Sequence, residues 1–155
     1  VKALGEAMGE LNLKTGTILL ALLLAGVFLG AFNLLAGAEL KFSTSMAIIS
    51  YALVPDAVKE LLGIVIVMLK EPRAIDPYNY IPSNLTILLG SDAPTWKMAL
   101  AGSVDLFAVW YLTLTVIGFK AANPKKISTG TAVSIVLGVY ALLTLIGVGM
   151  AAAFS

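Results

Sequence analysis

The chain has 155 residues, of which 59% are apolar and 12% are charged, and its net charge at pH 7 is +1. A soluble domain of this length could not bury so much apolar surface, so the composition predicts one membrane domain over residues 1–155. The sequence contains neither cysteine nor histidine. This excludes disulfides, thiol chemistry, the usual zinc sites and the commonest haem ligand, and the balanced charge offers no basic face for nucleic acid.

Residues 1–16 have the pattern of a short amphipathic helix. Leu4, Met8 and Leu11 fall on one helical face, and charged residues occupy the others. Such a segment could anchor at the membrane surface, or it could extend the span that follows. We favour the extension, because periodic signals in short segments are weak.

The first predicted span covers residues 17–36. It is uncharged and about 20 residues long, the length that crosses the hydrocarbon core of a bilayer. Gly26 and Gly30 form a G-x-x-x-G pair, in which small residues four apart allow another helix to approach closely. We expect this face to pack within the chain rather than to form a dimer.

The second predicted span covers residues 43–69 and has Pro55 near its middle. Proline lacks the backbone N–H and crowds the carbonyl four residues earlier, so the helix should be kinked or broken just before it. Tyr51 stands at that earlier position and is expected to face the freed carbonyl.

A polar segment at residues 70–97 follows, and its four prolines exclude a continuous helix. Within it, residues 85–89 are apolar but too few to span, so we expect them to lie at the interface or to dip into it. Ser83 is a candidate cap for this short piece. The third predicted span, 95–119, has Lys97 at its start and one charge in its interior, Asp105.

The fourth predicted span covers residues 128–153. Gly130, Ser134 and Gly138 form a small-residue stripe at a spacing of four, which predicts a second helix-packing face. The fold class is therefore all-α: a polytopic bundle of four transmembrane helices, the second of them kinked or broken at a proline.

The positive residues predict the orientation. With four spans, residues 1–16, the 70–97 loop and the C-terminus share one side, where five lysines and arginines are spread over a long stretch. Four lysines are concentrated in the short 37–42 and 120–126 turns on the other side. Positive residues in short loops mark the cytoplasm, so we expect the 120–126 turn inside and the 70–97 loop outside.

Four charged residues are placed inside the membrane: Asp56, Lys59, Glu60 and Asp105. Each charge costs about 2.5–3.5 kcal/mol at mid-bilayer, so the three in the second span cost roughly 7–10 kcal/mol. The twelve Leu, Ile and Val residues of positions 48–69 return about 4–7 kcal/mol. This span therefore needs a partner, or water around its charges.

The expected partner of Lys59 is Asp105. Lys59 precedes Lys70 by eleven residues, Asp105 follows Lys97 by eight, and helical rise puts both at similar depths from one membrane face. Asp56 lies three residues before Lys59 on nearly the same face, which predicts an Asp56–Lys59–Asp105 network. Glu60 should point away from it.

Two interpretations of this intramembrane polar cluster, with Tyr51 and Pro55 included, remain open. It could be a polar pathway or substrate site beside a broken helix, as in transporters. It could instead be an internal clamp that fixes helix order, which we favour because a lysine balances the acids. No catalytic, metal or cofactor motif accompanies it, so we predict neither an enzyme nor a bound cofactor.

Several motifs together resemble the Yip domain family (Ypt/Rab-interacting proteins), in particular its bacterial branch. They are residues 50–55 (SYALVP) followed by Lys59, residues 76–77 (DP), 83–85 (SNL), 103–110 (SVDLFAVW), 118–119 (GF) and 124–126 (PKK). The resemblance extends over nearly the whole chain from Gly16. No single motif is highly specific, and the order and spacing carry the likeness.

The resemblance implies an all-α protein that usually has five spans, of which this chain looks like the last four. In eukaryotes the family is associated with trafficking GTPases and membrane shaping; this chain lacks an N-terminal cytosolic segment, which puts a GTPase partner in doubt. We therefore expect a multi-pass protein of the bacterial inner membrane that organises membrane or serves as an accessory subunit, contacting other subunits through its small-residue faces. The alternative is a small transporter or channel component that uses the charged cluster.

Overall fold

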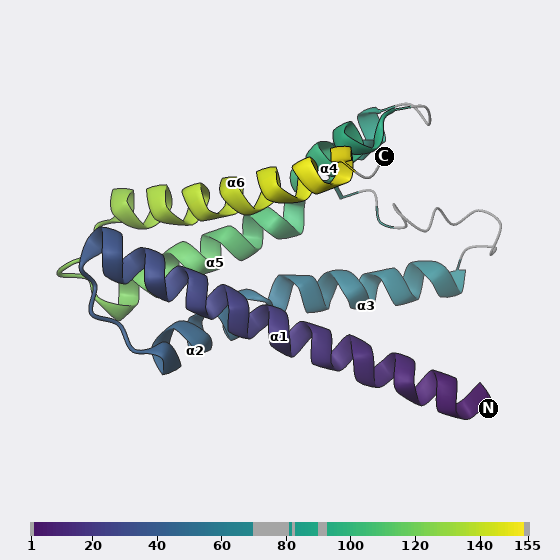
Figure 1. Cartoon of the computed structure of the whole chain (residues 1–155), viewed down its shortest axis with the longest axis horizontal. Helices are drawn as coiled ribbons and strands as arrows, with labels where there is room; N and C mark the ends of the chain where they lie inside the picture. Colours follow the sequence, from purple (N-terminus) through teal and green to yellow (C-terminus); the bar gives the residue numbers. More distant parts are fainter. Residues whose placement is uncertain (1, 70–80, 82, 90–92, 154–155) are drawn as a thin grey trace.

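The computed structural model describes residues 2–69, 81, 83–89 and 93–153, with side chains from residue 16 onward, and every regular element in these ranges is a helix. The elements in chain order (Figure 1) are α1 (Lys2–Ala36), α2 (Phe42–Ala52), α3 (Val54–Leu69), the short 3₁₀ helix η2 (Leu85–Leu88), α4 (Thr95–Ser103), α5 (Leu106–Ala122) and α6 (Thr129–Ala153). The all-α prediction is confirmed.

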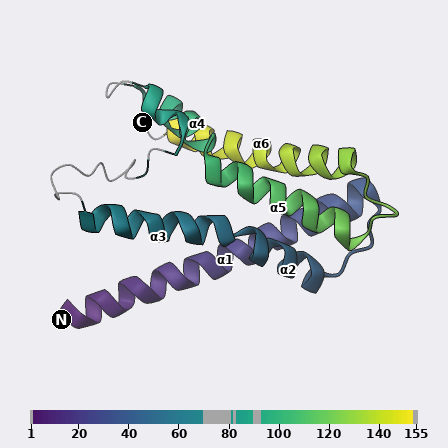
Figure 2. The same ribbon diagram turned by 180° about the vertical axis from the view of Figure 1, so that it is seen from behind.

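The long helices run lengthwise through the molecule, with both short turns at one end. In Figures 1 and 2, the turns after α1 and α5 lie at one end, and the two termini lie at the other. Helix α1 packs on α2 and α6, and α5 packs on α2, α3 and α6. Toward the end that carries the termini, α1 and α3 diverge.

Helix α1 continues without interruption from Lys2 to Ala36. The backbone of residues 2–15 therefore extends the first span, as favoured above; their side chains, and so the amphipathic face, lie outside the described residues. The helix stops at Gly37, whose φ of +57° is a left-handed conformation that glycine adopts without strain. The side-chain amide of Asn33 fastens the turn: its Nδ2 donates to the Leu40 carbonyl at 3.1 Å, and its Oδ1 accepts from the Leu40 N–H at 2.8 Å.

Two helical stretches are long and apolar enough to cross a membrane, judged by length and composition within the described ranges. They are Gly16–Ala36 and Thr129–Ala153, and they match the first and fourth predicted spans. The other two predicted spans are divided into shorter helices. Residues 43–69 separate into α2 and α3 at Leu53, and residues 95–119 separate into α4 and α5 at Val104 and Asp105. Each half is shorter than the roughly 20 residues that a continuous crossing needs.

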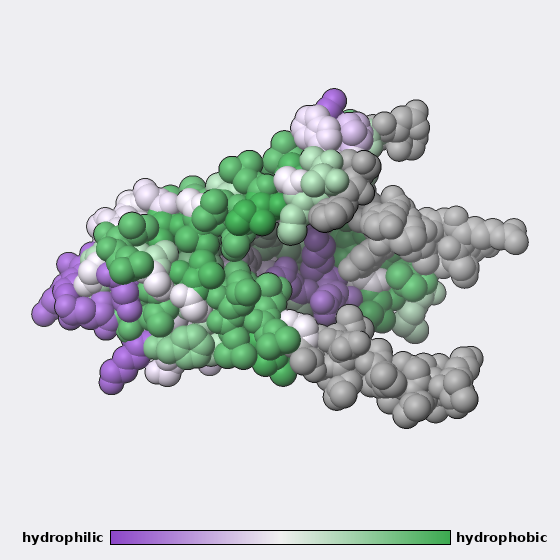
Figure 3. Space-filling model, viewed as in Figure 1, coloured by the Kyte–Doolittle hydropathy of each residue, from purple (hydrophilic) through white to green (hydrophobic). Residues whose placement is uncertain are grey.

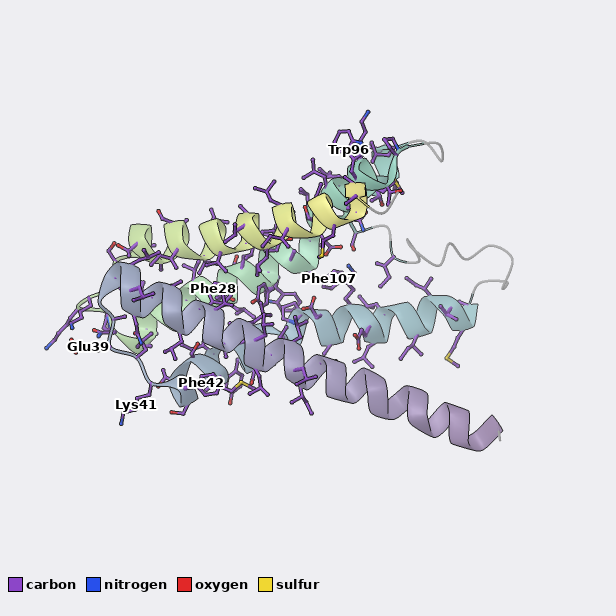
Figure 4. The ribbon with its side chains drawn as sticks, viewed as in Figure 1. Phe28, Glu39, Lys41, Phe42, Trp96 and Phe107 are labelled. Atoms are coloured by element: carbon purple, nitrogen blue, oxygen red, sulfur yellow. The ribbon has the colours of Figure 1, made fainter. Side chains whose placement is uncertain are left out.

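The core lies between α1, α2, α5 and α6, in the half of the molecule near the short turns. Its centre is aromatic: Phe32 stacks on Phe119 with ring centroids 4.2 Å apart, and Phe28 meets the same ring at 5.7 Å. Figure 4 shows Phe28 directed from α1 toward the interior. The buried Ser45 hydroxyl of α2 donates to the Ala25 carbonyl of α1 at 2.7 Å, which ties these two helices together.

The predicted small-residue faces point outward, which corrects the expectation that the first of them packs within the chain. A Cβ added at Gly26, Gly30 or Gly138 would meet no atom within 4 Å, and Gly130 and Ser134 are exposed. Helix α1 packs through Ala25, Phe28 and Phe32 instead, and α6 through Ala132, Ile135 and Val136. Because each residue turns a helix by about 100°, a packing face one or two positions away leaves the glycines on another side.

Side chains join the two short turns directly. Lys126 Nζ lies 2.7 Å from Glu39 Oε1, and Asn123 Nδ2 donates to the Ala38 carbonyl at 2.9 Å. The hydrogen bond and charge of Lys126 lower the pKa of the exposed Glu39 carboxyl. Figure 4 shows Glu39 and Lys41 at this end of the molecule.

Candidate functional site

The candidate site begins at the interruption between α4 and α5, which the sequence analysis did not predict. Val104 leaves the helical conformation, and Asp105 becomes the N-cap of α5, with its Oδ1 accepting from the Phe107 N–H at 2.7 Å. An aspartate at an N-cap satisfies an otherwise unpaired helical N–H and places its charge at the positive end of the helix dipole. The one charge in the interior of the third predicted span thus has a local structural reason.

The second carboxylate oxygen of Asp105 binds two other segments. Lys59 Nζ of α3 lies 2.7 Å from Oδ2, and the Ser83 hydroxyl donates to the same oxygen at 2.6 Å. Asp105 is 5% exposed, whereas the Lys59 side chain is 28% exposed. The depth argument from the sequence therefore placed this pair correctly, and Asp105 joins α3, α5 and the segment before η2.

The backbone at residues 83–85 also returns to the interruption. The Leu106 N–H donates to the Ser83 carbonyl at 3.0 Å, and the Leu85 N–H donates to the Val104 carbonyl at 3.3 Å. These bonds satisfy polar backbone groups that the broken helix exposes. Asn84, rather than the expected Ser83, caps η2 by accepting from the Thr86 N–H at 3.0 Å.

The interruption between α2 and α3 brings Lys59 to this place. Helix α2 ends at Ala52, α3 begins at Val54, and Pro55 is buried in the first turn of α3, where its missing N–H costs little. Lys59 then lies one turn further along α3. Its Nζ is 5.8 Å from the ring centroid of Phe107, which Figure 4 shows at the start of α5.

Asp56 and Glu60 do not join the ion pair, although Asp56 lies within the electrostatic reach of both Lys59 and Asp105. Both side chains are exposed, and within the described residues no ion pair or hydrogen bond is made by the Asp56 carboxylate. They line a hollow of about 610 Å³ between α1 and the α2–α3 junction, together with Lys59 and Ser50. Figure 3 shows hydrophilic side chains at the base of a recess between apolar walls.

Tyr51 is not part of the cluster. It is 77% exposed and borders a separate groove between α2 and α5, on the same lining as Ile117 and Gly118. Two tyrosines that the sequence analysis did not single out take its place. Tyr111 and Tyr140 line an inner cavity of about 240 Å³ together with Asp56, so this carboxylate borders both hollows.

The hydroxyl of Tyr111 is buried without a partner. Its residue is 8% exposed, and the neighbouring Thr115 hydroxyl donates to the Tyr111 backbone carbonyl at 2.8 Å instead. Among the described side chains it is the one buried polar atom with no hydrogen bond. The Tyr140 hydroxyl, in contrast, donates to the Ser103 carbonyl at the end of α4. Both tyrosines lie in the middle of predicted spans, far from the interfaces where tyrosine usually occurs. This position was the sequence signal that could have identified them.

Within the described ranges, no group of three or more His, Cys, Asp or Glu side chains could hold a metal ion. In this arrangement the Asp105 carboxylate is paired and hydrogen-bonded, and it holds helices together. A second carboxylate, Asp56, faces a hollow.

The comparisons with known proteins identify a family. The family model of the Yip1 domain matches residues 3–151, which is nearly the whole chain and begins before Gly16, where the motif resemblance starts. Neither the curated proteins nor the solved structures contain a match to the chain.

Proposed function

Because this chain belongs to the Yip1 domain family of membrane proteins, we propose that it is a non-enzymatic, multi-pass protein that organises membrane or serves as an accessory subunit of a larger membrane assembly. Its contact surfaces are the outward small-residue faces of α1 and α6. The proposed location is a bacterial inner membrane, with the 120–126 turn in the cytoplasm and the 70–97 segment outside.

The proposed topology has four crossings, two of them made by broken helices. Helices α2 and α3 form one crossing and α4 and α5 another, each covering 28 residues from the first residue to the last. The backbone groups exposed at the second break bond to residues 83–85, as lipid requires of any irregular segment at membrane depth. Both short turns lie at one end of the molecule and the termini at the other, which supports an even number of crossings.

The observation that carries the proposed role is the open space in front of the small-residue faces. Helices in lipid associate through close backbone approach, since the lipid supplies no hydrophobic driving force between them. Gly26, Gly30 and Gly138 have no neighbouring atom within 4 Å of an added Cβ, so this chain does not use them for its own packing. They are available to the transmembrane helices of other proteins.

The test is the size of the native assembly in mild detergent. We expect the wild-type protein to migrate with other membrane proteins, and a Ser134→Leu/Gly138→Leu variant to migrate alone with an unchanged unfolding midpoint. A tagged and an untagged copy expressed together distinguish a partner protein from a second copy. If the wild type and the variant migrate identically as a lone chain, the proposal is wrong.

Transport is a second candidate function, favoured by one observation. Two broken helices meet at the Lys59–Asp105 pair, and the unpaired Asp56 faces a hollow beside them. Discontinuous helices beside a polar site near mid-membrane are a recurring arrangement in transporters. Water access discriminates the two functions: transport requires Asp56 to be reachable from both membrane faces in turn, whereas a scaffold does not.

A further inference from the structure

The groove between α2 and α5 is apolar and opens to the outside of the molecule. Its volume is about 590 Å³, and apart from Thr44 and Tyr51 every residue that lines it is apolar. Ala47 on one wall and Ala121 on the other are exposed, so the groove is not covered by another part of the described chain. For helices that cross a membrane, such a groove faces lipid.

The length of this groove matches one leaflet of a bilayer. Its α2 wall extends from Thr44, next to the turn before α2, to Val54, and ten residues of helix cover about 15 Å. Its α5 wall ends at Ala122, next to the turn after α5. The hydrocarbon core is about 30 Å thick, so the groove covers half of it, beginning at the end with the turns. A transmembrane helix of a partner would cross both halves, whereas a lipid acyl chain occupies one.

The turns at this end carry an excess of positive charge. They contain four lysines and one glutamate, which gives a net charge of +3 (four minus one). Two of the lysines have partners: Lys126 Nζ lies 2.7 Å from Glu39 Oε1, and Lys120 Nζ donates to a hydroxyl at the start of α6 at 2.7 Å. Lys41 and Lys125 are exposed, and neither side chain makes an ion pair or hydrogen bond with the described part of the chain.

These two lysines without partners are the ones nearest to the groove in the sequence. Lys41 is the N-cap of α2 and precedes Thr44 by three residues, and Lys125 follows Ala122 by three residues. Three residues of chain span at most about 11 Å, and the long flexible stem of lysine lets its ammonium group lie at the membrane surface. Figure 4 shows Lys41 at the end of the molecule where α2 begins. Each wall of the groove therefore has a cation at its surface end.

We propose that this groove binds one acyl chain of an anionic phospholipid, whose phosphate is held by Lys41 and Lys125. Basic residues beside a gap between membrane helices favour acidic headgroups, and the apolar walls pack against the chain. A zwitterionic lipid fits the walls equally well but has no net charge for the lysines. The site requires only that the chain lies in a membrane and is independent of the proposed helix contacts, since neither Gly26 nor Gly138 lines it.

The experiment measures the lipids that the full chain retains in native mass spectrometry, with phosphatidylglycerol and phosphatidylcholine of identical acyl chains titrated in mild detergent. We expect phosphatidylglycerol to bind about 25-fold more tightly, because two lysines each favour an anionic headgroup about fivefold. In Lys41→Gln/Lys125→Gln this preference should fall to within about threefold, the part left to more distant charges. The matched control is Lys97→Gln/Lys120→Gln, which removes the same charge away from the groove and should keep a preference of about tenfold or more.

Filling the groove tests the seat of the acyl chain separately. Ala47→Leu/Ala121→Leu adds bulk to both walls at exposed positions and should keep the wild-type unfolding midpoint. Both lipids should then bind about tenfold more weakly or worse, as the loss of two buried methylene groups predicts. Equal binding of the two lipids to the wild type, or unchanged binding of phosphatidylglycerol to the filled variant, would overturn the proposal. A dimer mass that the filled variant loses would instead mean that the groove holds a second copy of the chain, which also contradicts it.

Discussion

Asp105 connects more of this molecule than any other single side chain described above. It caps α5, pairs with Lys59 of α3 and accepts the Ser83 hydroxyl, so one carboxylate satisfies three donors from three segments. A carboxylate with this many partners tolerates burial in lipid, because three donors, one of them cationic, compensate for its lost hydration. This geometry supports the clamp interpretation for Asp105, while Asp56 lies outside the ion pair.

Replacing Asp105 tests the clamp. We expect Asp105→Leu to lower the unfolding free energy by about 3 kcal/mol, the lower end for breaking a buried pair, because Lys59 keeps 28% of its side chain exposed. Loss of the N-cap adds about 1 kcal/mol. The measurement is the thermal unfolding midpoint in detergent, together with the yield of folded protein.

The matched rescue is the double variant Lys59→Met/Asp105→Asn. Both charges are removed, yet the asparagine oxygen still caps α5 and its side-chain N–H can donate to the Ser83 hydroxyl, so stability should recover in part. A double variant as unstable as the sum of the two single changes would show that the pair is not a clamp.

The pKa of Glu39 gives a second prediction at this scale. Lys126 holds it below its ordinary value, so the contact contributes above pH 4.5 and is lost as the pH falls through the lower folded pKa. In Lys126→Met we expect the Glu39 carboxyl to titrate higher, measured by carbon NMR of the side chain. An unchanged titration would mean that the two turns are not in contact in solution.

At the scale of the elements, α2 and α5 approach each other closely at Gly118. A Cβ added there would lie 2.5 Å from Ile48 Cγ2, a distance that real Cβ atoms do not show. This glycine allows α2 to lie flat against α5, as small residues do between membrane helices. By contrast, α3 buries only Pro55 and Gly63 and depends on the ion pair for its position beside α5.

Gly118→Ala should therefore lower the unfolding free energy by about 1–3 kcal/mol, since overpacking forces a shift of the neighbouring side chain. Gly138→Ala is the matched control on α6, where an added Cβ meets nothing, and a gain of up to about 1 kcal/mol from helix propensity is expected. Ile48→Ala in the Gly118→Ala background should remove the clash and recover part of the loss. Equal effects at both glycines would contradict the packing described for α2 and α5.

At the scale of the whole molecule, the two ends differ in character. The turn end carries Glu39, Lys41 and Lys126 next to the aromatic core, whereas α1 and α3 diverge toward the other end (Figure 1). The packed core lies toward the turn end, so the two ends of the molecule can be told apart by experiment. The orientation of these ends in the membrane is therefore the property to measure first.

Single cysteines report this orientation cleanly, because the chain contains none. We expect Lys97→Cys to react with an impermeant maleimide applied to intact cells. Lys41→Cys and Lys125→Cys should react only after permeabilisation, since their turns are assigned to the cytoplasm. Labelling of Lys41→Cys and Lys97→Cys from the same side would contradict the proposed even number of crossings.

The sequence by itself determined the all-helical class, the two long apolar helices and the Lys59–Asp105 pair. Composition, the length of an apolar run and the helical rise per residue are properties of the chain itself. They can therefore be used without knowing which residues are neighbours in space. The sequence could not reveal that the third span is interrupted just before Asp105, because the groups that stabilise this interruption belong to Ser83 and Lys59, far away in the sequence. Nor could it tell which side of a helix its small residues face. Only the tertiary packing decided that Gly26 and Gly138 look outward, that Tyr51 lies apart, and that Tyr111 shares a cavity with Asp56.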